Sequence, residues 1–302
     1  MPLLSICIPT YNRKDCLQQC IDSIIEQSVF SEIEIVVSDN ASNDGTEEMM
    51  AGYVVKYPNI IYSRNSENLW FDRNMLKVVS LAHGKYCCFI GDDDAFFPES
   101  ITGIMKILAE WGADYFITNN WGYDISLLEP VTLRPNLSIE ENKRYTTLKE
   151  FVYSLQPDRI KTVGFFGGMS WQIFLKEKWD TCSEKEVFIG SQTIHLFVLL
   201  HSMIESPLIL IAEPSIKTRA DNIRWDTFHM KSLWKREKLT LDTFVHIAKL
   251  YDIPYSAFSL YIRFVRSYMK NMSILAIKKY ILKDQRTIIY LKKLISKFIP
   301  IS

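Results

Sequence analysis

Short apolar runs and segments of helical spacing alternate through the first hundred residues. Between the first two runs, residues 14–27 carry an apolar residue every three or four positions, as an amphipathic helix does. Thr46 opens a second helical segment, and residues 72–82 form a third. Alternation of this kind predicts an α/β fold with a doubly wound, mostly parallel sheet flanked by helices. The predicted strands are residues 3–8, 33–37, 60–63 and 86–90, followed much later by 208–212.

Polar residues follow three of these strands directly. Residues 9–12 follow the first strand, Asp39 and Asn40 end the second, and residues 92–94, all Asp, follow the fourth. Ligands of doubly wound sheets bind at the carboxyl ends of the strands, so the three polar segments predict one site.

The three adjacent carboxylates of residues 92–94 repel one another unless a cation neutralises them. Hard oxygen ligands suit Mg²⁺ or Mn²⁺, which in turn bind phosphates. The alternative is an acidic turn that caps a helix beginning at Pro98.

Four stretches resemble family 2 inverting glycosyltransferases of the GT-A fold, in order and spacing as well as in residues. The match is strong over residues 1–110 and loose over 160–225, and within the family it is most similar to O-antigen sugar transferases of the abequosyltransferase kind. The four stretches are SICIPTYNR (5–13), VVSDNASNDGT (36–46), NLWFDRN (68–74) and FIGDDDAFFP (89–98).

The resemblance implies a nucleotide-sugar donor site after the first two strands. Pro9, Thr10, Tyr11 and Asn12 would cradle the base and ribose, and Asp39 would read the base. A carboxylate accepts the N3–H of uracil or thymine or the amine of cytosine, so UDP, dTDP and CDP stay open and guanine is not excluded. The alternative for each of these residues is a structural role within its own turn.

In those alternatives, Asn12 or Asp15 caps the helix that follows, and Asp39 bonds its own turn, with Asn40 beside it.

The third stretch leads into the helix that precedes the acidic motif. Asn68 and Arg73 are assigned to the donor site there, with Arg73 steadying a ribose or the acidic cluster; a surface arginine is the alternative. The family usually has Gly where this chain has Trp70, which leaves the backbone shape of this loop open.

The family's metal motif, Asp-x-Asp-Asp, is altered in this chain. Counting back from the following proline puts Gly91 at the first aspartate, so that Asp93 and Asp94 bind the metal and Asp92 serves the ribose or the metal. Asp221 stands where the family often has a metal-binding His, a loop aspartate being the alternative. The expected Mg²⁺ or Mn²⁺ would stabilise the leaving nucleotide as a Lewis acid.

The catalytic base is the hardest residue to assign. Inverting transfer needs a carboxylate, or less often a His, to take the proton of the acceptor hydroxyl. No acid lies between residues 187 and 202, where the family often has an acidic pair. The nearby candidates are Glu184, Glu186 and His195, of which His195 and Glu186 are assigned. The expected helix around His195 makes a half-buried packing role the alternative. Residues 163–179, rich in Gly and aromatics, are expected to face the acceptor or to form an edge strand with a core of Phe and Trp.

The charge of the chain is unevenly placed. Net charge is zero overall, yet residues 262–302 hold ten Lys or Arg and a single acid, Asp284. Within this tail Lys292, Lys293 and Lys297 flank an apolar helical stripe, so the tail is expected to lie on an anionic membrane surface. A tail packed on the catalytic domain is the alternative.

We therefore expect a GT-A domain over residues 1–225, with a donor half (1–110) and an acceptor half (111–225), and a helical basic region over 226–302. Six cysteines without metal spacing, no signal peptide and no apolar run of about 20 residues favour a cytoplasmic enzyme at the inner face of a bacterial membrane. No nucleic-acid partner is expected.

The expected function is transfer of a sugar from a nucleoside-diphosphate donor to a saccharide acceptor, often lipid-linked in this family, in surface polysaccharide or O-antigen synthesis. A nucleotidyltransferase is the second hypothesis, but residues 9–12 are not the glycine-rich basic loop that it needs. A non-catalytic sugar-binding relative is the third, suggested by Gly91 and by the missing acidic pair.

Overall fold

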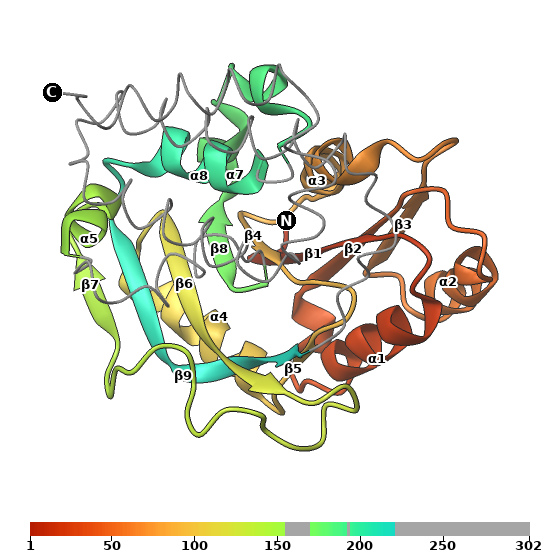
Figure 1. Cartoon of the computed structure of the whole chain (residues 1–302), viewed down its shortest axis with the longest axis horizontal. Coiled ribbons are helices and arrows are strands. Elements are labelled where there is room, and N and C mark those ends of the chain that lie inside the picture. Colours follow the sequence, from red (N-terminus) through yellow and green to blue (C-terminus); the bar gives the residue numbers. More distant parts are fainter. Residues whose placement is uncertain (155–169, 192–193, 221–302) are drawn as a thin grey trace, which may run out of the picture.

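The computed structural model describes residues 1–154, 170–191 and 194–220. Its strands form one curved sheet with helices on both faces (Figure 1). The strands are β1 (Leu4–Thr10), β2 (Glu34–Asp39), β3 (Ile60–Arg64), β4 (Tyr86–Phe89), β5 (Ala95–Phe96), β6 (Tyr115–Tyr123), β7 (Lys143–Tyr145), β8 (Gln172–Leu175) and β9 (Leu208–Arg219). The α-helices are α1 (Lys14–Ile25), α2 (Thr46–Lys56), α3 (Trp70–Leu81), α4 (Ser100–Trp111), α5 (Leu148–Ser154), α7 (Lys176–Asp180) and α8 (Ile194–Met203). Two 3₁₀ turns, η1 (Phe30–Glu32) and η2 (Lys185–Phe188), complete the described elements.

The sheet follows the order β3-β2-β1-β4-β8-β6-β9-β5, with β7 paired to β9. Neighbours β3, β2, β1 and β4 are parallel, and so are β6 and β9. Strand β8 runs antiparallel between β4 and β6. The predicted doubly wound, mostly parallel sheet is therefore confirmed, and the predicted strands of the first half fall within two residues of the observed ones.

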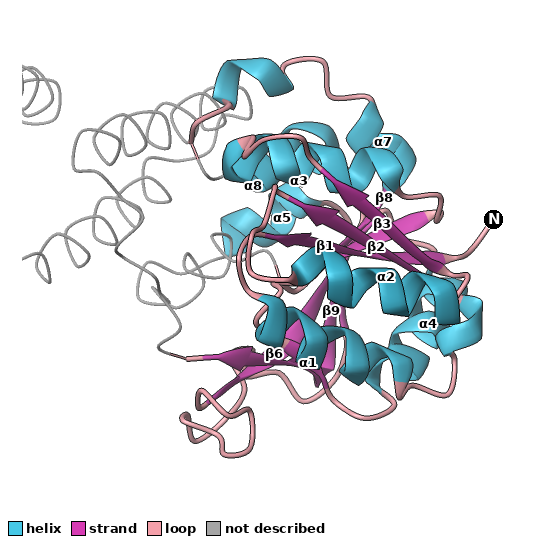
Figure 2. Cartoon of the chain, turned by 90° about the vertical axis from the view of Figure 1, so that its right-hand side faces the viewer, coloured by secondary structure: helices cyan, strands magenta, loops and turns pink. Residues whose placement is uncertain are grey.

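The sheet is buried on both faces, which explains why its strands read as continuous apolar runs. Along β1, Ile6 and Ile8 pack with the apolar faces of α1, α2 and α4. Cys7, between them, points to the opposite side and packs with α3, α7 and α8. Figure 2 shows these two helical layers above and below the strands. Alternation along a single strand thus builds two cores.

The second half differs from expectation in two places. Strand β8, an edge strand in the alternative interpretation, lies inside the sheet, whereas the burial of Phe174 and Trp179 agrees with the core role that this alternative gave to Phe and Trp. Residues 163–169 of that predicted segment lie outside the described part. The strand expected at 208–212 continues to Arg219 because β6 and then β5 pair along its length.

The basic tail predicted for residues 226–302 lies outside the described residues, and the boundary at residue 225 stays a prediction. In the described ranges, no helix combines the length and apolar character needed to span a bilayer.

Gly84, just before β4, lies so close to the start of β1 that it gives a stability prediction. A Cβ added at Gly84 would lie 2.5 Å from Ser5 Oγ and 2.6 Å from Ser5 N, which belongs to the backbone of β1. We expect Gly84→Ala to lower the free energy of unfolding by about 1–3 kcal/mol, the usual cost of overpacking. Gly52, in α2, has no atom within 4 Å of such a Cβ.

Gly52→Ala should therefore raise stability by about 0.5–1 kcal/mol, because alanine favours the helix. Urea unfolding of both variants measures the difference. Equal effects of the two substitutions would contradict the packing at Gly84.

Candidate functional site

The three aspartates form a tight turn between β4 and β5. The backbone N–H of Asp94 donates to the carbonyl of Gly91 at 3.1 Å. The hydroxyl of Thr10, at the end of β1, donates to Asp92 Oδ2 at 2.8 Å. The backbone N–H of Arg219, at the end of β9, donates to Asp94 Oδ1 at 2.9 Å. The acidic turn thus lies where the ends of β1, β4 and β9 meet.

Two arginines bring positive charge to this turn. The Nη1 atom of Arg13 lies 2.6 Å from Asp93 Oδ2 and 3.4 Å from Asp92 Oδ1. The Nε of Arg219 donates to the backbone carbonyl of Asp93 at 2.8 Å, and its Nη2 donates to Gln19 Oε1 at 2.6 Å. Arg13 therefore partly neutralises the carboxylates, and Arg219 holds the backbone of the turn.

Neutralisation of the carboxylates by Arg13 is incomplete. Burial, and then the charge of Asp93, raise the pKa of Asp92 to about 7, although Arg13 and Thr10 pull the other way. Burial, and then Asp93, likewise raise the pKa of Asp94 to about 7. A further cation beside the turn would favour the ionised forms of both carboxyls.

The chemistry of this donor set fits a hard divalent ion that keeps other ligands. In the described part of the chain, no group of three or more His, Cys, Asp and Glu side chains is placed to hold a metal alone. Mg²⁺ and Mn²⁺ commonly use one or two protein carboxylates together with water and substrate phosphates. Asp93 and Asp94 match that need, while Asp221 lies outside the described residues, two positions beyond Arg219.

The two helix-capping alternatives for these loops are wrong. At the start of α4, Ser100 N donates to the carbonyl of Phe97, and Ile101 N donates to Gln27 Oε1, so the acidic turn does not cap that helix. Nor do Asn12 and Asp15 cap α1, because its first N–H, from Lys14, donates to Asp44 Oδ2 at 2.8 Å.

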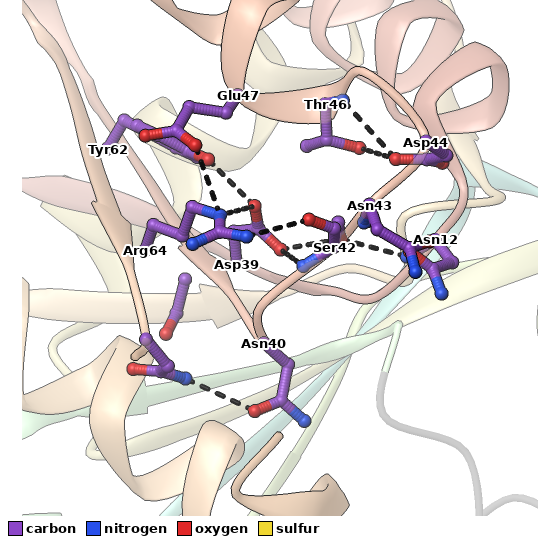
Figure 3. A network of polar contacts seen from close by, with 12 residues as sticks. Asn12, Asp39, Asn40, Ser42, Asn43, Asp44, Thr46, Glu47, Tyr62 and Arg64 are labelled. Carbon is purple, nitrogen blue, oxygen red and sulfur yellow. Dashed lines mark hydrogen bonds and ion pairs between the residues drawn. The ribbon is translucent and has the colours of Figure 1, made fainter. Parts of the chain in front are cut away.

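Asp39 is fully buried at the end of β2 and holds its own loop together (Figure 3). Its Oδ1 accepts both the N–H and the hydroxyl of Ser42, at 2.9 and 2.5 Å. Its Oδ2 accepts the Tyr62 hydroxyl at 2.7 Å and lies 3.8 Å from Arg64 Nε. Burial, followed by the bond to Asp39, raises the pKa of Tyr62, so its hydroxyl stays a donor.

These bonds agree with the turn-aspartate alternative for Asp39. Its role in reading the base stays a prediction.

The other residues assigned to the donor cradle occupy the end of β1 and the turn after it. Pro9 and Thr10 are the last residues of β1, and Tyr11 is 40% exposed. Asn12 adopts a left-handed φ of +53°, donates its N–H to Ser42 Oγ at 2.9 Å and accepts from Asn43 N at 2.8 Å. The turns after β1 and β2 are therefore joined, with an accessible aromatic ring beside them.

Asn40 and Asn68 link the loop after β2 to the start of α3. Asn40 Nδ2 donates to Asn68 Oδ1 at 2.7 Å, and Asn40 Oδ1 accepts from Leu69 N at 2.8 Å. Trp70 then adopts φ +63°, the left-handed conformation that glycine favours. The loop thus keeps a glycine-like backbone although it carries an indole.

The first turn of α3 reaches the acceptor half. Arg73 pairs with Glu186 at 3.4 Å, and both side chains are more than half exposed, which agrees with the surface-arginine alternative. Asp72, 2% exposed, accepts the N–H groups of Gly190 at 2.6 Å and Ile194 at 3.3 Å. A carboxylate therefore does lie at the start of α8, supplied by α3.

His195 lies on α8, as predicted, but it is only 1% exposed. Its ring packs edge-on against Phe71 at 6.0 Å and Phe89 at 6.5 Å between centroids. This burial favours a packing role. Glu186, on η2, has a side chain that is 71% exposed. Assignment of either residue as catalytic base stays a prediction.

Three residues near the site had no role in the sequence analysis: Arg13, Asp72 and Arg219. Arg13 and Arg219 each lie inside or beside a segment that resembles the family, which was the available signal. Asp72 also lies inside such a stretch, residues 68–74, but it looks like an ordinary acid of the first turn of α3, and only the tertiary contact with Gly190 shows what it does.

Comparison with known proteins agrees with this geometry. Residues 5–168 match the family described as Glycosyl transferase family 2. The chain is 35% identical over 260 residues to the abequosyltransferase RfbV of Salmonella typhimurium, covering 84% of this chain and 76% of the relative.

Solved structures show the same fold at low sequence identity. TarS of S. aureus (residues 1–349) superposes with a TM-score of 0.63 at 14% identity, covering 91% of this chain and 75% of that one. The same protein bound to UDP-GlcNAc gives 0.59 at 14% identity, over 80% of this chain and 66% of that one. The mannosyltransferase PcManGT of Pyrobaculum calidifontis, in complex with GDP-Man and Mn²⁺, superposes with a TM-score of 0.51 at 12% identity, covering 96% of this chain and 83% of that one.

A mostly parallel sheet with a polar site at its strand ends, together with the match over more than half of the chain, defines a nucleotide-sugar transferase fold. The chain belongs to glycosyltransferase family 2 and has the GT-A fold. It is a glycosyltransferase, as predicted from the sequence, and this finding disfavours the second hypothesis, a nucleotidyltransferase.

Gly91 gives a prediction for the altered metal motif. A Cβ there would lie 2.8 Å from Asp93 Oδ1, 3.1 Å from Ser170 Oγ and 3.2 Å from Asp94 Oδ2. We expect Gly91→Asp, which recreates the usual motif, to weaken Mn²⁺-dependent nucleoside-diphosphate binding because the turn must shift away from Asp93, Ser170 and Asp94 to make room for the new side chain. Isothermal titration calorimetry with the nucleoside diphosphate, in the presence and absence of Mn²⁺, measures the change in affinity.

Gly103→Asp is the matched control for Gly91→Asp, since it adds the same charge where no atom lies within 4 Å of a new Cβ. It should bind like the wild type. Tighter Mn²⁺ binding by Gly91→Asp would show that position 91 is an open ligand position.

Proposed function

We propose that this glycosyltransferase moves a sugar from a nucleoside-diphosphate donor to a saccharide acceptor with inversion, in the synthesis of a surface polysaccharide such as O-antigen. The observation that carries the proposal is the buried acidic turn, whose Asp92 and Asp94 have raised pKa values at the meeting point of β1, β4 and β9. Relatives named as an abequosyltransferase and as a poly(ribitol-phosphate) beta-glucosyltransferase support a polysaccharide acceptor.

Asp93 and Asp94 are the proposed ligands of Mg²⁺ or Mn²⁺, with Asp221 as a third. When bound, the ion would neutralise the diphosphate of the leaving nucleotide. Asp93 is the most exposed of the three carboxylates of the turn, with 21% of its side chain accessible, and is therefore the one that a ligand reaches first.

The chain's own residues position the donor around this turn. Thr10 fixes Asp92 for the ribose or the metal, and the exposed ring of Tyr11 offers a face for the base. Asp39 keeps the adjoining loop in shape, and its carboxylate is the proposed base reader. Of the two candidate bases, Glu186 is the one that an acceptor hydroxyl reaches without rearrangement, because His195 is buried.

Metal-dependent nucleotide binding tests the proposal. A thermal-shift panel of UDP, CDP, GDP and dTDP, each with and without Mn²⁺, identifies the preferred diphosphate. We expect Asp93→Asn to weaken binding of that diphosphate in Mn²⁺ by at least about tenfold, or about 1.4 kcal/mol, and to leave metal-free binding unchanged.

The matched control for Asp93→Asn is Asp15→Asn, on α1, whose carboxylate is 88% exposed. It should behave like the wild type. Equal affinities with and without Mn²⁺ in the wild type and in both variants would remove the metal from the proposed function.

We also propose that the basic tail holds the enzyme at the inner face of the bacterial membrane, close to a lipid-linked acceptor. The support is the sequence of residues 262–302, with ten Lys or Arg, one acid and an apolar helical stripe. Each basic residue near an anionic surface contributes about 1 kcal/mol, and salt screens that attraction.

Liposome flotation of the full chain tests the membrane proposal. With anionic vesicles we expect flotation at low salt, a loss at high salt, and a strong reduction when Lys292, Lys293 and Lys297 are replaced by Glu. Replacing the exposed Lys56, Lys106 and Lys143 of the catalytic domain by Glu is the matched control and should leave flotation in place. Absence of flotation of the full chain at low salt would make the tail a packing element.

A further inference from the structure

Trp70 combines two unfavourable features at one position. Its backbone is left-handed, with φ +63°, which is strained for any bulky side chain. The residue is also 72% exposed, so a large apolar surface stays in water. Strain of this kind persists where the surroundings hold it in place, and it concentrates at ligand sites.

The surroundings of Trp70 do hold it in place. Asn68 Oδ1 accepts the Trp70 N–H at 2.8 Å as well as Asn40 Nδ2 at 2.7 Å. One turn further along α3, Asn74 accepts from Ser38 Oγ at 2.8 Å and from Asn65 Nδ2 at 3.0 Å. Side-chain amides on both sides of the loop thus fix the start of α3 to the end of β2.

Trp70 also lies at the junction of the two halves of the enzyme. Asn40 and Asn68, which hold its backbone, belong to the loops assigned to the donor. Two and three residues further on, Asp72 contacts Gly190 and Arg73 contacts Glu186, both in the acceptor half. An exposed indole at this junction is placed to meet the saccharide that receives the sugar.

We propose that Trp70 is a specificity-determining residue whose indole stacks on the apolar face of the acceptor saccharide. A pyranose presents a patch of C–H groups on one face, and a flat aromatic ring covers it with little loss of side-chain freedom. The strained backbone holds the indole outward. This inference rests on the proposed transfer to a saccharide, and it adds the residue that recognises the acceptor.

Saturation-transfer difference NMR with methyl β-D-galactopyranoside and methyl β-D-glucopyranoside, in the presence of the preferred nucleoside diphosphate and Mn²⁺, tests the stacking. We expect transfer to the contiguous C–H face of at least one pyranoside in the wild type and in Trp70→Phe, which keeps an aromatic ring. In Trp70→Gly the transfer should fall at least fivefold. Equal transfer in Trp70→Gly, or no transfer to either sugar in the wild type, would overturn the proposal.

Two further readouts separate this role from a structural one. The melting temperature of Trp70→Gly should equal or exceed that of the wild type, since glycine adopts the left-handed backbone without strain. Its affinity for the nucleoside diphosphate should stay within twofold of the wild type, so that loss of stacking with intact nucleotide binding is distinct from failure of the proposed function.

A lower melting temperature would show that the indole serves the fold. A selective loss of UDP-GlcNAc affinity relative to UDP would assign Trp70 to the donor sugar. Either result would overturn the acceptor assignment.

Discussion

Mutual repulsion among three adjacent carboxylates governs the arrangement of this site. Asp92, Asp93 and Asp94 follow a buried strand. Their charges are partly offset by Arg13, from the turn after β1, while Arg219, from the end of β9, binds the backbone carbonyl of Asp93. The offset is incomplete, since burial still raises the pKa values of Asp92 and Asp94. A site of this kind favours an additional cation, which is the physical basis of the proposed metal and diphosphate binding.

The sheet makes this concentration of charge possible. Because β1 and β4 are parallel neighbours and β9 returns along the far side of β6, three strand ends distant in sequence meet at one edge. The two cores on either face of β1 hold those ends in register. The neighbouring segments after β2 and β3 carry the buried Asp39 network and the strained Trp70.

The N-terminal half of the fold was predictable because each buried strand is a continuous apolar run and each helix repeats its apolar residues every three or four positions. The acidic turn was predictable as part of a site because polar residues follow three predicted strands, whose carboxyl ends meet at one edge of the sheet. The arginines that hold it were not, because Arg13 lies 80 residues from Asp93 and Arg219 lies 126 residues away. The same holds for Asp72, whose partner Gly190 is 118 residues away.

Mn²⁺ titration in the absence of nucleotide tests the central claim most directly, in the wild type and in Arg13→Gln. Arg13 forms an ion pair with Asp93 Oδ2 and adds a positive charge beside the proposed metal ligands. If the acidic turn is a cation site that Arg13 partly fills, then Arg13→Gln binds Mn²⁺ more tightly than the wild type, by at least severalfold. Unchanged or weaker Mn²⁺ binding in Arg13→Gln would contradict the account.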